Sequence, residues 1–357
     1  MSKYHIHKDI KQAHTLPGSF YHNQEDYHKL LETVFYHSWH FLADKNIFSE
    51  DISCVPLQLN TGKSVEEIIL LKDKDIKCLS NICTHRGKVI VEKASKLKML
   101  SCSYHGRCFD LEGKFKSMPE FKEVLNFPTE NDNLKKLDVK NIGTLLFTSL
   151  HNKVSFDKIF EPFLNRLFWF PFDELKFDAS SSEEYLIDAN WALYCDNYLE
   201  GFHVPFVHPG LDEKLDYGLY DTELFEYSNV QVGHADNDAT FFDLPEESED
   251  FGKKIHAYYW WFFPNLMLNV YTWGISINIV EPLTINKTKV RFLTYLLPEK
   301  NANGFSKELL HKTEMEDEEV VLSVQKGTKS SFYNSGRFSA KREQGVHHFH
   351  RLIDRYL

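Results

Sequence analysis

Two cysteine–histidine pairs, one short segment apart, constrain this chain more than any other feature of its sequence. The first pair is Cys83-x-His85 and the second is Cys102-x-x-His105. Thiolate and imidazole groups are ligands of zinc and of iron–sulfur clusters. The four side chains therefore predict a metal centre that is held between two neighbouring loops.

Zinc and an iron–sulfur cluster both use this ligand set, but the order of the ligands favours the cluster. Zinc fingers pair cysteine with cysteine and histidine with histidine, whereas each loop here supplies one of each. A two-iron cluster matches the mixed pairing, because one iron takes both thiolates and the other takes both imidazoles. Gly87 and Gly106 follow the two histidines and let the backbone turn tightly around the site.

A second histidine-rich stretch, NYLEGFHVPFVH, follows at residues 197–208. His203 and His208 bracket Pro205, and Glu200 precedes His203 by three residues. Two imidazoles and one carboxylate on one side of an iron form the facial triad of non-haem enzymes, which leaves positions open for O₂ and substrate. The stretch therefore predicts a mononuclear iron site whose carboxylate comes from elsewhere in the chain.

Together the two stretches resemble the Rieske non-haem iron oxygenases, whose large (alpha) subunit carries both sites. The resemblance includes the flanking HRG and YHG of the cluster loops and runs over nearly the full length of the chain. Within the ring-hydroxylating oxygenase superfamily, the chain is most similar to the choline, betaine and carnitine monooxygenases. The resemblance implies one Rieske [2Fe–2S] cluster and one mononuclear Fe(II) per chain, on Cys83, His85, Cys102 and His105, and on His203 and His208, respectively.

The same resemblance assigns roles to further residues near the iron. Glu200 corresponds to a carboxylate that, in the family, bridges to a Rieske histidine of the neighbouring protomer. Asn197 stands where the family has a polar residue close to the iron. The family's "ED" followed by an apolar stretch and "VQ-G" falls on Asp317, which is the predicted third iron ligand.

Helix geometry supports Asp317 within the acidic run at 314–319. Most acidic residues on a helix form a solvated face, and we expect this of most of this run. Glu316 and Glu318 are the alternatives for the third ligand. One stripe at i, i+3, i+4 and i+7 is otherwise apolar and predicts that its acidic member faces the interior: Asp317, Val320, Val321 and Val324.

Changes of periodicity divide the chain into three segments. Residues 1–40 are predicted to be a helical segment that packs on the catalytic domain, with helix periodicity over 19–40. Short strand-like runs predict the Rieske domain at 41–150, and mixed helices and strands predict the catalytic domain at 151–357. The expected fold class is α+β: a small all-β domain inserted into a larger domain. The resemblance implies that this larger domain is a helix-grip (START-like) fold with an antiparallel sheet.

Composition excludes several classes of protein. The net charge is −11 and no basic run is present, which argues against nucleic-acid binding. The N-terminus lacks an apolar stretch, and no segment is apolar enough for a membrane span. Six cysteines are too few and too uneven for a secreted disulfide framework, so we expect a cytoplasmic protein.

The family resemblance implies the reaction and its partners. Electrons are expected from NAD(P)H through a separate reductase or ferredoxin, and O₂ is expected to hydroxylate or oxidatively N-demethylate a small molecule. A head-to-tail homotrimer is the expected assembly. The alternatives are a ring-hydroxylating dioxygenase that acts on an arene and a Rieske electron carrier without catalysis, although a carrier has no use for the second histidine stretch.

Aromatic residues bear on the substrate. The run YYWWFF at 258–263, with Tyr271 and Trp273, is consistent with two interpretations. The rings form a wall that binds a quaternary ammonium cation, or they fill the face of a sheet. The first interpretation favours a quaternary ammonium substrate, and the sequence leaves both open.

Overall fold

The structure is a computed structural model that describes residues 3–208, 215–236, 239–298 and 306–357. All the side chains predicted as ligands lie within these ranges, whereas parts of the predicted segments, at 1–2, 209–214, 237–238 and 299–305, lie outside them. The chain forms two compact units. The smaller is Tyr36–Asn152, and the larger combines Met1–Phe35 with Lys153–Leu357.

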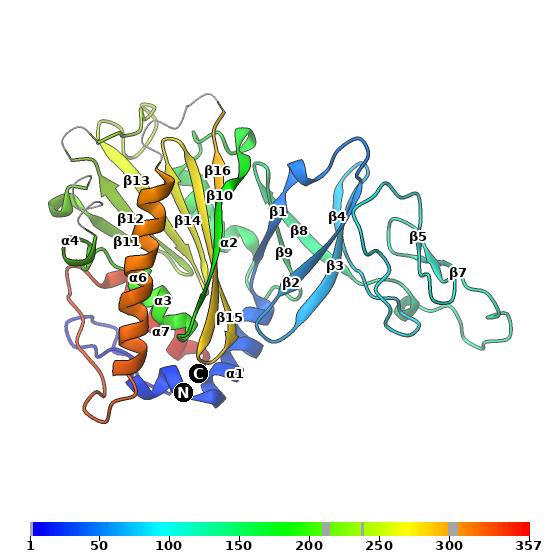
Figure 1. The fold of residues 1–357 in the computed structure, drawn as a ribbon, viewed down its shortest axis with the longest axis horizontal. Coiled ribbons are helices and arrows are strands. Elements are labelled where there is room, and N and C mark those ends of the chain that lie inside the picture. The colour runs from blue at the N-terminus through cyan, green and yellow to red at the C-terminus, as the bar shows by residue number, and fades with distance from the viewer. Residues whose placement is uncertain (1–2, 209–214, 237–238, 299–305) are drawn as a thin grey trace. The chain divides into compact units, whose positions relative to one another are not determined.

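The regular structure of the smaller unit consists of antiparallel strands and short 3₁₀ turns (Figure 1). A six-stranded sheet has the order β1-β9-β8-β4-β3-β2, and a three-stranded sheet has the order β5-β6-β7. The loops with the two cysteine–histidine pairs follow β4 and join β5 to β6. The strands are β1 His40–Asp44, β2 Cys54–Asn60, β3 Val65–Lys72, β4 Ile76–Ser80, β5 Leu100–Ser101, β6 Cys108–Phe109, β7 Phe115–Ser117, β8 Lys136–Ile142 and β9 Leu145–Ser149. Two short 3₁₀ turns are η3 Lys45–Ile47 and η4 Glu130–Asp132.

The larger unit is a seven-stranded antiparallel sheet with helices (Figure 1). The strand order is β10-β16-β15-β14-β13-β12-β11. The strands are β10 Lys176–Ile187, β11 Asp221–Leu224, β12 Ser228–His234, β13 Ile255–Phe262, β14 Leu266–Tyr271, β15 Gly274–Thr284 and β16 Lys287–Leu296. The helices are α1 Gln24–Thr33, α2 Phe156–Arg166, α3 Trp191–Tyr198, α4 Val204–Val207, α6 Lys307–Gly327 and α7 Gln344–Tyr356, with 3₁₀ turns η1 Gly18–His22, η2 Phe35–His37 (which runs across the unit boundary), η5 Phe172–Glu174 and η6 Tyr217–Leu219. The fold is α+β, as the sequence predicts.

Alternation along β13 divides its aromatic residues between the two faces of the sheet. Trp260 lies edge-on to Phe163 of α2, with ring centroids 5.4 Å apart. Trp261, one residue on, contacts Phe349 of α7 at 5.4 Å on the opposite face. Tyr259 shares that second face, where α3, α6 and α7 also lie. The face toward α2 is therefore filled by aromatic packing, and the other face is free to line a site.

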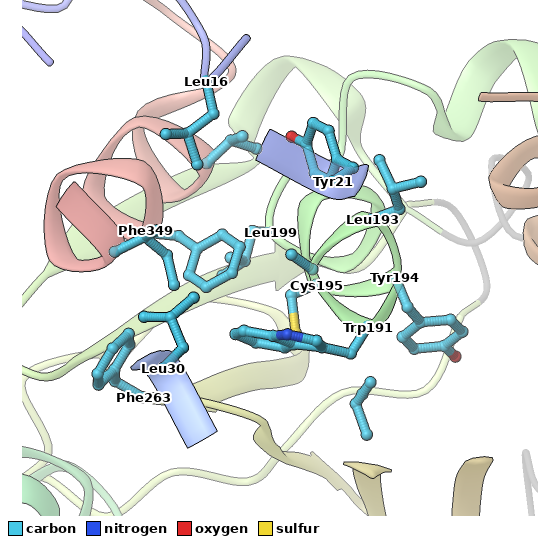
Figure 2. Close-up of a cluster of buried hydrophobic side chains, with 14 of the residues drawn as sticks. Leu16, Tyr21, Leu30, Trp191, Leu193, Tyr194, Cys195, Leu199, Phe263 and Phe349 are labelled. Atoms are coloured by element: carbon cyan, nitrogen blue, oxygen red, sulfur yellow. The ribbon is translucent and has the colours of Figure 1, made fainter. Parts of the chain in front are cut away.

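A hydrophobic cluster ties α1, α3 and α7 together (Figure 2). Trp191 opens α3 and packs edge-on against Phe35 at 4.8 Å and against Phe349 at 5.7 Å. In α7, the buried side chains recur at helical spacing: Val346, Phe349, Leu352 and Ile353. Residues from both ends of the chain thus hold α3 in place, and α3 leads directly into the second histidine stretch.

The helix predicted over residues 19–40 is shorter in the structure. Asn23 caps α1, because its side chain accepts hydrogen bonds from the N–H groups of Glu25 and Asp26. The helix ends at Thr33, and single 3₁₀ turns flank it on both sides. The apolar residues do recur at helical spacing, but the cap at Asn23 and the flanking 3₁₀ turns divide the segment, so it is not one continuous helix.

The apolar stripe predicted for α6 is wrong at its C-terminal end. Val321 is buried, whereas Val324 is 43% exposed and Gln325 takes the inward position. The Gln325 side chain accepts from the Asn190 N–H at 3.0 Å and so anchors α6 to the start of α3. Among the helices in the described ranges, none combines the length and the apolar character that a bilayer crossing needs.

Replacing Phe349 with alanine tests the packing of α7. The ring is fully buried, so we expect the free energy of unfolding of the larger unit to fall by about 3–5 kcal/mol. Urea unfolding followed by tryptophan fluorescence measures this loss. Phe332→Ala is the matched control, because Phe332 is fully exposed and should change stability by no more than about 0.5 kcal/mol. Equal losses in the two variants would contradict this account of the core.

Candidate functional site

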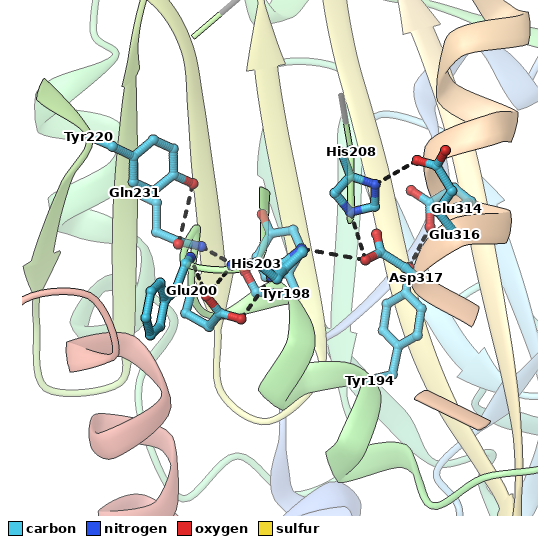
Figure 3. A network of polar contacts seen from close by, with 11 residues as sticks. Tyr194, Tyr198, Glu200, His203, His208, Tyr220, Gln231, Glu314, Glu316 and Asp317 are labelled. Atoms are coloured by element: carbon cyan, nitrogen blue, oxygen red, sulfur yellow. Dashed lines mark hydrogen bonds and ion pairs between the residues drawn. The ribbon is translucent and has the colours of Figure 1, made fainter. Parts of the chain in front are cut away.

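Three side chains from two distant segments converge in the larger unit (Figure 3). His203 follows α3, His208 follows α4, and Asp317 comes from the middle of α6. Asp317 Oδ1 lies 2.9 Å from His208 Nε2 and 3.5 Å from His203 Nε2. One ligand atom from each side chain falls within 4.8 Å of the others, which is the arrangement of a metal site.

Each imidazole of this cluster is also held from behind by a carboxylate (Figure 3). His203 Nδ1 lies 2.7 Å from Glu200 Oε1, and His208 Nδ1 lies 2.8 Å from Glu316 Oε2. Carboxylates in this position fix the tautomer and the orientation of a metal-binding histidine. Both rings therefore present Nε2 to the same point. Glu316, an alternative for the third ligand, lies instead on the outer nitrogen of His208.

Burial and the neighbouring charges shift the pKa values of these groups in opposite directions. Burial lowers the pKa of His203, but Asp317 and Glu200 outweigh it and raise the pKa to about 10. His208 follows the same pattern, with Asp317 and Glu316 raising its pKa. Burial raises the pKa of Asp317, and the two histidines lower it below the usual value. The carboxylates thus favour the protonated form of both imidazoles, and a metal that binds Nε2 competes with that protonation.

A pocket opens beside the three converging side chains. It lies between α6, α3 and the inner face of the seven-stranded sheet, and Asn197 is one of its lining residues. Two imidazoles and one carboxylate at the end of a pocket fit Fe(II), because this donor set leaves coordination positions free. The open side of the cluster faces the space in which a small substrate would lie.

Glu314 is a site residue that sequence reasoning missed, and Glu316, expected only as an alternative iron ligand, instead holds the outer nitrogen of His208. Both belong to the acidic run that was expected to be mostly a solvated face, and that expectation is wrong for them. Glu314 lines the pocket, where its Oε2 accepts a hydrogen bond of 2.6 Å from the Tyr194 hydroxyl. Its position three residues before Asp317 places both on one face of α6, and this spacing was the available signal.

The two loops of the smaller unit share one hydrogen-bond pattern. The Cys83 N–H donates to the backbone carbonyl oxygen of Lys88 at 2.8 Å, and the Gly87 N–H donates to that of Cys83 at 3.0 Å. The second loop repeats both bonds. The Cys102 N–H donates to Arg107 O at 2.8 Å, and the Gly106 N–H donates to Cys102 O at 3.0 Å. Both glycines have positive φ, +74° and +70°, which a side chain would strain.

These loops bring the four predicted cluster ligands together. His85 Nδ1 and His105 Nδ1 face each other at 3.2 Å, and both cysteines are buried beneath the loops. Burial raises the pKa of Cys83, and the backbone N–H groups of His85 and Arg86 oppose that effect. Burial and nearby positive charge keep the pKa of His85 below its usual value, so its ring is neutral and able to ligate. Two thiols and two imidazoles in this arrangement fit a Rieske cluster.

Comparison with known families agrees with both sites. Residues 48–128 match the Rieske [2Fe–2S] domain, and residues 172–357, just over half of the chain, match the family described as "Ring hydroxylating alpha subunit (catalytic domain)". The chain belongs to the ring-hydroxylating alpha subunits. It is therefore a Rieske-type oxygenase component, an oxidoreductase whose cofactors are a [2Fe–2S] cluster and a mononuclear iron.

Curated relatives of this Rieske oxygenase match over almost its whole length. The chloroplastic choline monooxygenase of Arabidopsis thaliana is 29% identical, over 96% of this chain and 83% of the relative. The carnitine monooxygenase oxygenase subunit of Escherichia coli (strain K12) is 26% identical, over 96% of this chain and 94% of the relative. Both relatives are monooxygenases.

Solved structures share the fold. A quaternary ammonium Rieske monooxygenase has a TM-score of 0.80 at 22% identity, covering 99% of this chain and 98% of that chain. Naphthalene 1,2-dioxygenase from Rhodococcus sp. has a TM-score of 0.68 at 19% identity, covering 96% of this chain and 93% of that chain. At these identities the likeness concerns the fold, which monooxygenases and dioxygenases share.

Metal affinity at the His203–His208–Asp317 cluster should rise with pH. The raised histidine pKa values mean that binding displaces protons, so each proton released steepens the affinity by up to about tenfold per pH unit below those pKa values. Calorimetric titration of Fe(II) or Co(II) between pH 6 and 8, in buffers of different ionisation enthalpy, measures the protons released. Binding that releases no proton over this range would contradict the assignment of these imidazoles as ligands.

Proposed function

We propose that this protein oxidises a small quaternary ammonium compound with O₂. In this proposal Cys83, His85, Cys102 and His105 hold the [2Fe–2S] cluster, and His203, His208 and Asp317 hold the iron. A separate NAD(P)H-dependent reductase or a ferredoxin supplies the electrons. The relatives named as choline and carnitine monooxygenases support this substrate class.

An aromatic wall in the pocket is the observation that carries the proposal. Four rings follow one another along it, two from strands β13 and β14 and two from the segments that connect elements: Tyr259, Tyr271, Tyr220 and Trp273. Tyr271 and Trp273 are stacked, with centroids 4.8 Å apart and planes at 11°. Tyr259 meets Tyr271 edge-on at 5.9 Å, and Tyr220 lies 6.3 Å from Tyr259. The faces of such rings attract a cation that has few hydrogen-bonding groups of its own.

Other residues of the chain orient the iron ligands and exclude water from the pocket. Glu200 and Glu316 hold the Nδ1 protons of His203 and His208, so that Nε2 remains directed at the metal position. The buried aromatic wall excludes water from the space next to it. Iron, when bound, supplies the one-electron chemistry that O₂ requires. The side chains thus orient the ligands and the substrate, and they shield the reaction from solvent.

Glu200 has a second role in this proposal, between protomers. Its carboxylate lies on the outer nitrogen of His203 and is partly accessible, with 14% of the side chain exposed. In a head-to-tail homotrimer, it would accept a hydrogen bond from His105 of a neighbouring copy and complete an electron path to His203. Inter-subunit electron transfer is described for the structurally similar quaternary ammonium monooxygenase.

Coupled turnover tests the substrate class. With a surrogate reductase, we expect NADH-dependent O₂ uptake to be stimulated by choline or a betaine and not by naphthalene. Product analysis by mass spectrometry then separates hydroxylation, which gives an alcohol or an aldehyde, from N-demethylation, which gives a tertiary amine and formaldehyde. Stimulation by arenes alone, with a dihydrodiol as product, would overturn the quaternary ammonium proposal in favour of ring dioxygenation.

Replacing Glu200 with alanine tests the bridge. We expect both metal sites to fill, since none of the proposed ligands is removed, while turnover falls by about 10- to 100-fold because an outer carboxylate of a ligand histidine is lost. Iron and sulfide analysis reports whether the metal sites are filled, and stopped-flow reoxidation of the reduced cluster reports the rate of electron transfer out of it. Glu319→Ala, an exposed acid on α6, is the control. Full activity in the Glu200 variant would remove its proposed role.

A further inference from the structure

Glu314 occupies a place in the pocket to which nothing above gives a role. It lies on α6 three residues before Asp317 and lines the same pocket, on the side of α3. The Tyr194 hydroxyl donates to its Oε2 at 2.6 Å and fixes the carboxyl group in one orientation (Figure 3). A carboxyl group is thus built into the substrate space, close to the iron site and outside the set of proposed ligands.

The other pocket carboxylates are engaged with basic groups. Asp317 faces the two histidines, and Glu200 lies on His203. Glu183, near the start of α6, is 2.9 Å from His311 and 3.4 Å from Lys307. Glu183 also accepts from the Tyr185 phenol, but among the described residues that line the pocket, Glu314 is the carboxyl group with a phenol partner and no basic partner. A cationic ligand in the pocket would therefore be the first positively charged neighbour of this carboxyl group.

Glu314 also lies close enough to the aromatic side of the pocket to act on the rings there. Burial raises the pKa of the Tyr194 phenol, and the charge of Glu314 raises it further. For Tyr198 and Tyr271, burial and neighbouring tyrosines act first, and Glu314 again adds to the rise. Tyr271 belongs to the aromatic wall. The carboxyl group and the wall therefore act on the same enclosed space.

We propose that Glu314 is the counterion of the substrate's ammonium group and thereby selects charged substrates over neutral ones of the same shape. This inference rests on the proposed function, since it assigns a partner to the cation of a quaternary ammonium substrate. The aromatic wall binds the methyl groups through the ring faces, and the carboxylate supplies the full charge that rings lack. Burial next to Asp317 disfavours ionisation of Glu314, and a cation beside it has the opposite effect.

Binding measurements on a charged ligand and its neutral isostere test this role. Choline and 3,3-dimethylbutan-1-ol have nearly the same shape and differ by the charge on the central atom. Each is titrated calorimetrically into anaerobic protein loaded with cluster and iron. Glu314→Gln keeps an oxygen that can accept from Tyr194, and Glu319→Gln removes an exposed charge from the same helix as the matched control.

We expect Glu314→Gln to weaken choline binding by about tenfold or more and to leave binding of the neutral alcohol unchanged. Glu319→Gln should change neither, and iron content should be equal in all three proteins. Unchanged choline affinity in Glu314→Gln, or an equal loss in Glu319→Gln, would overturn the counterion role while leaving the proposed function intact. If wild-type protein neither binds nor oxidises any quaternary ammonium compound, the proposed function itself fails.

Discussion

The hydrogen bonds between carboxylates and the outer nitrogens of two histidines are the interactions on which the site depends. Glu200 and Glu316 hold the outer nitrogens of the two imidazoles, so that Nε2 of each ring is directed at Asp317. These carboxylates come from segments that are more than a hundred residues apart. They meet because α6 lies against α3, and α3 is held by the cluster around Trp191. Site geometry is therefore a property of the whole larger unit.

The parts of the site that could be predicted from sequence are those with short-range patterns. The Cys/His pairs and the two histidines around Pro205 carry their chemistry in their spacing, and the family resemblance extended this to Asp317. The roles that the structure gives Glu314 and Glu316 could not be predicted in the same way. An acidic residue on a helix usually faces water, and its true environment depends on what packs against that face. Gln325, buried in place of Val324, shows the same limitation.

The aromatic run in β13 presented two interpretations, and alternation along the strand shows packing on one face and leaves a cation-binding wall on the other as a proposal. Trp260 fills the face toward α2, while Tyr259 faces the pocket. Successive residues of a strand point to opposite sides, so one run can build a packed layer and a binding wall together. The composition of the run could be read from sequence. The assignment of each ring to a face required the register of the sheet, which long-range pairing determines.

Helix α6 carries the group proposed to meet the cation and the aspartate proposed to meet the metal, three residues apart. An α-helix rises 1.5 Å per residue, so these two positions are offset by about 4.5 Å along a rigid rod. If both proposed roles hold, this offset sets how many bonds separate the nitrogen of a bound substrate from its carbon nearest the metal. Regiochemistry would then follow from helix register, and a homologue lengthened by one methylene would present a different carbon for attack.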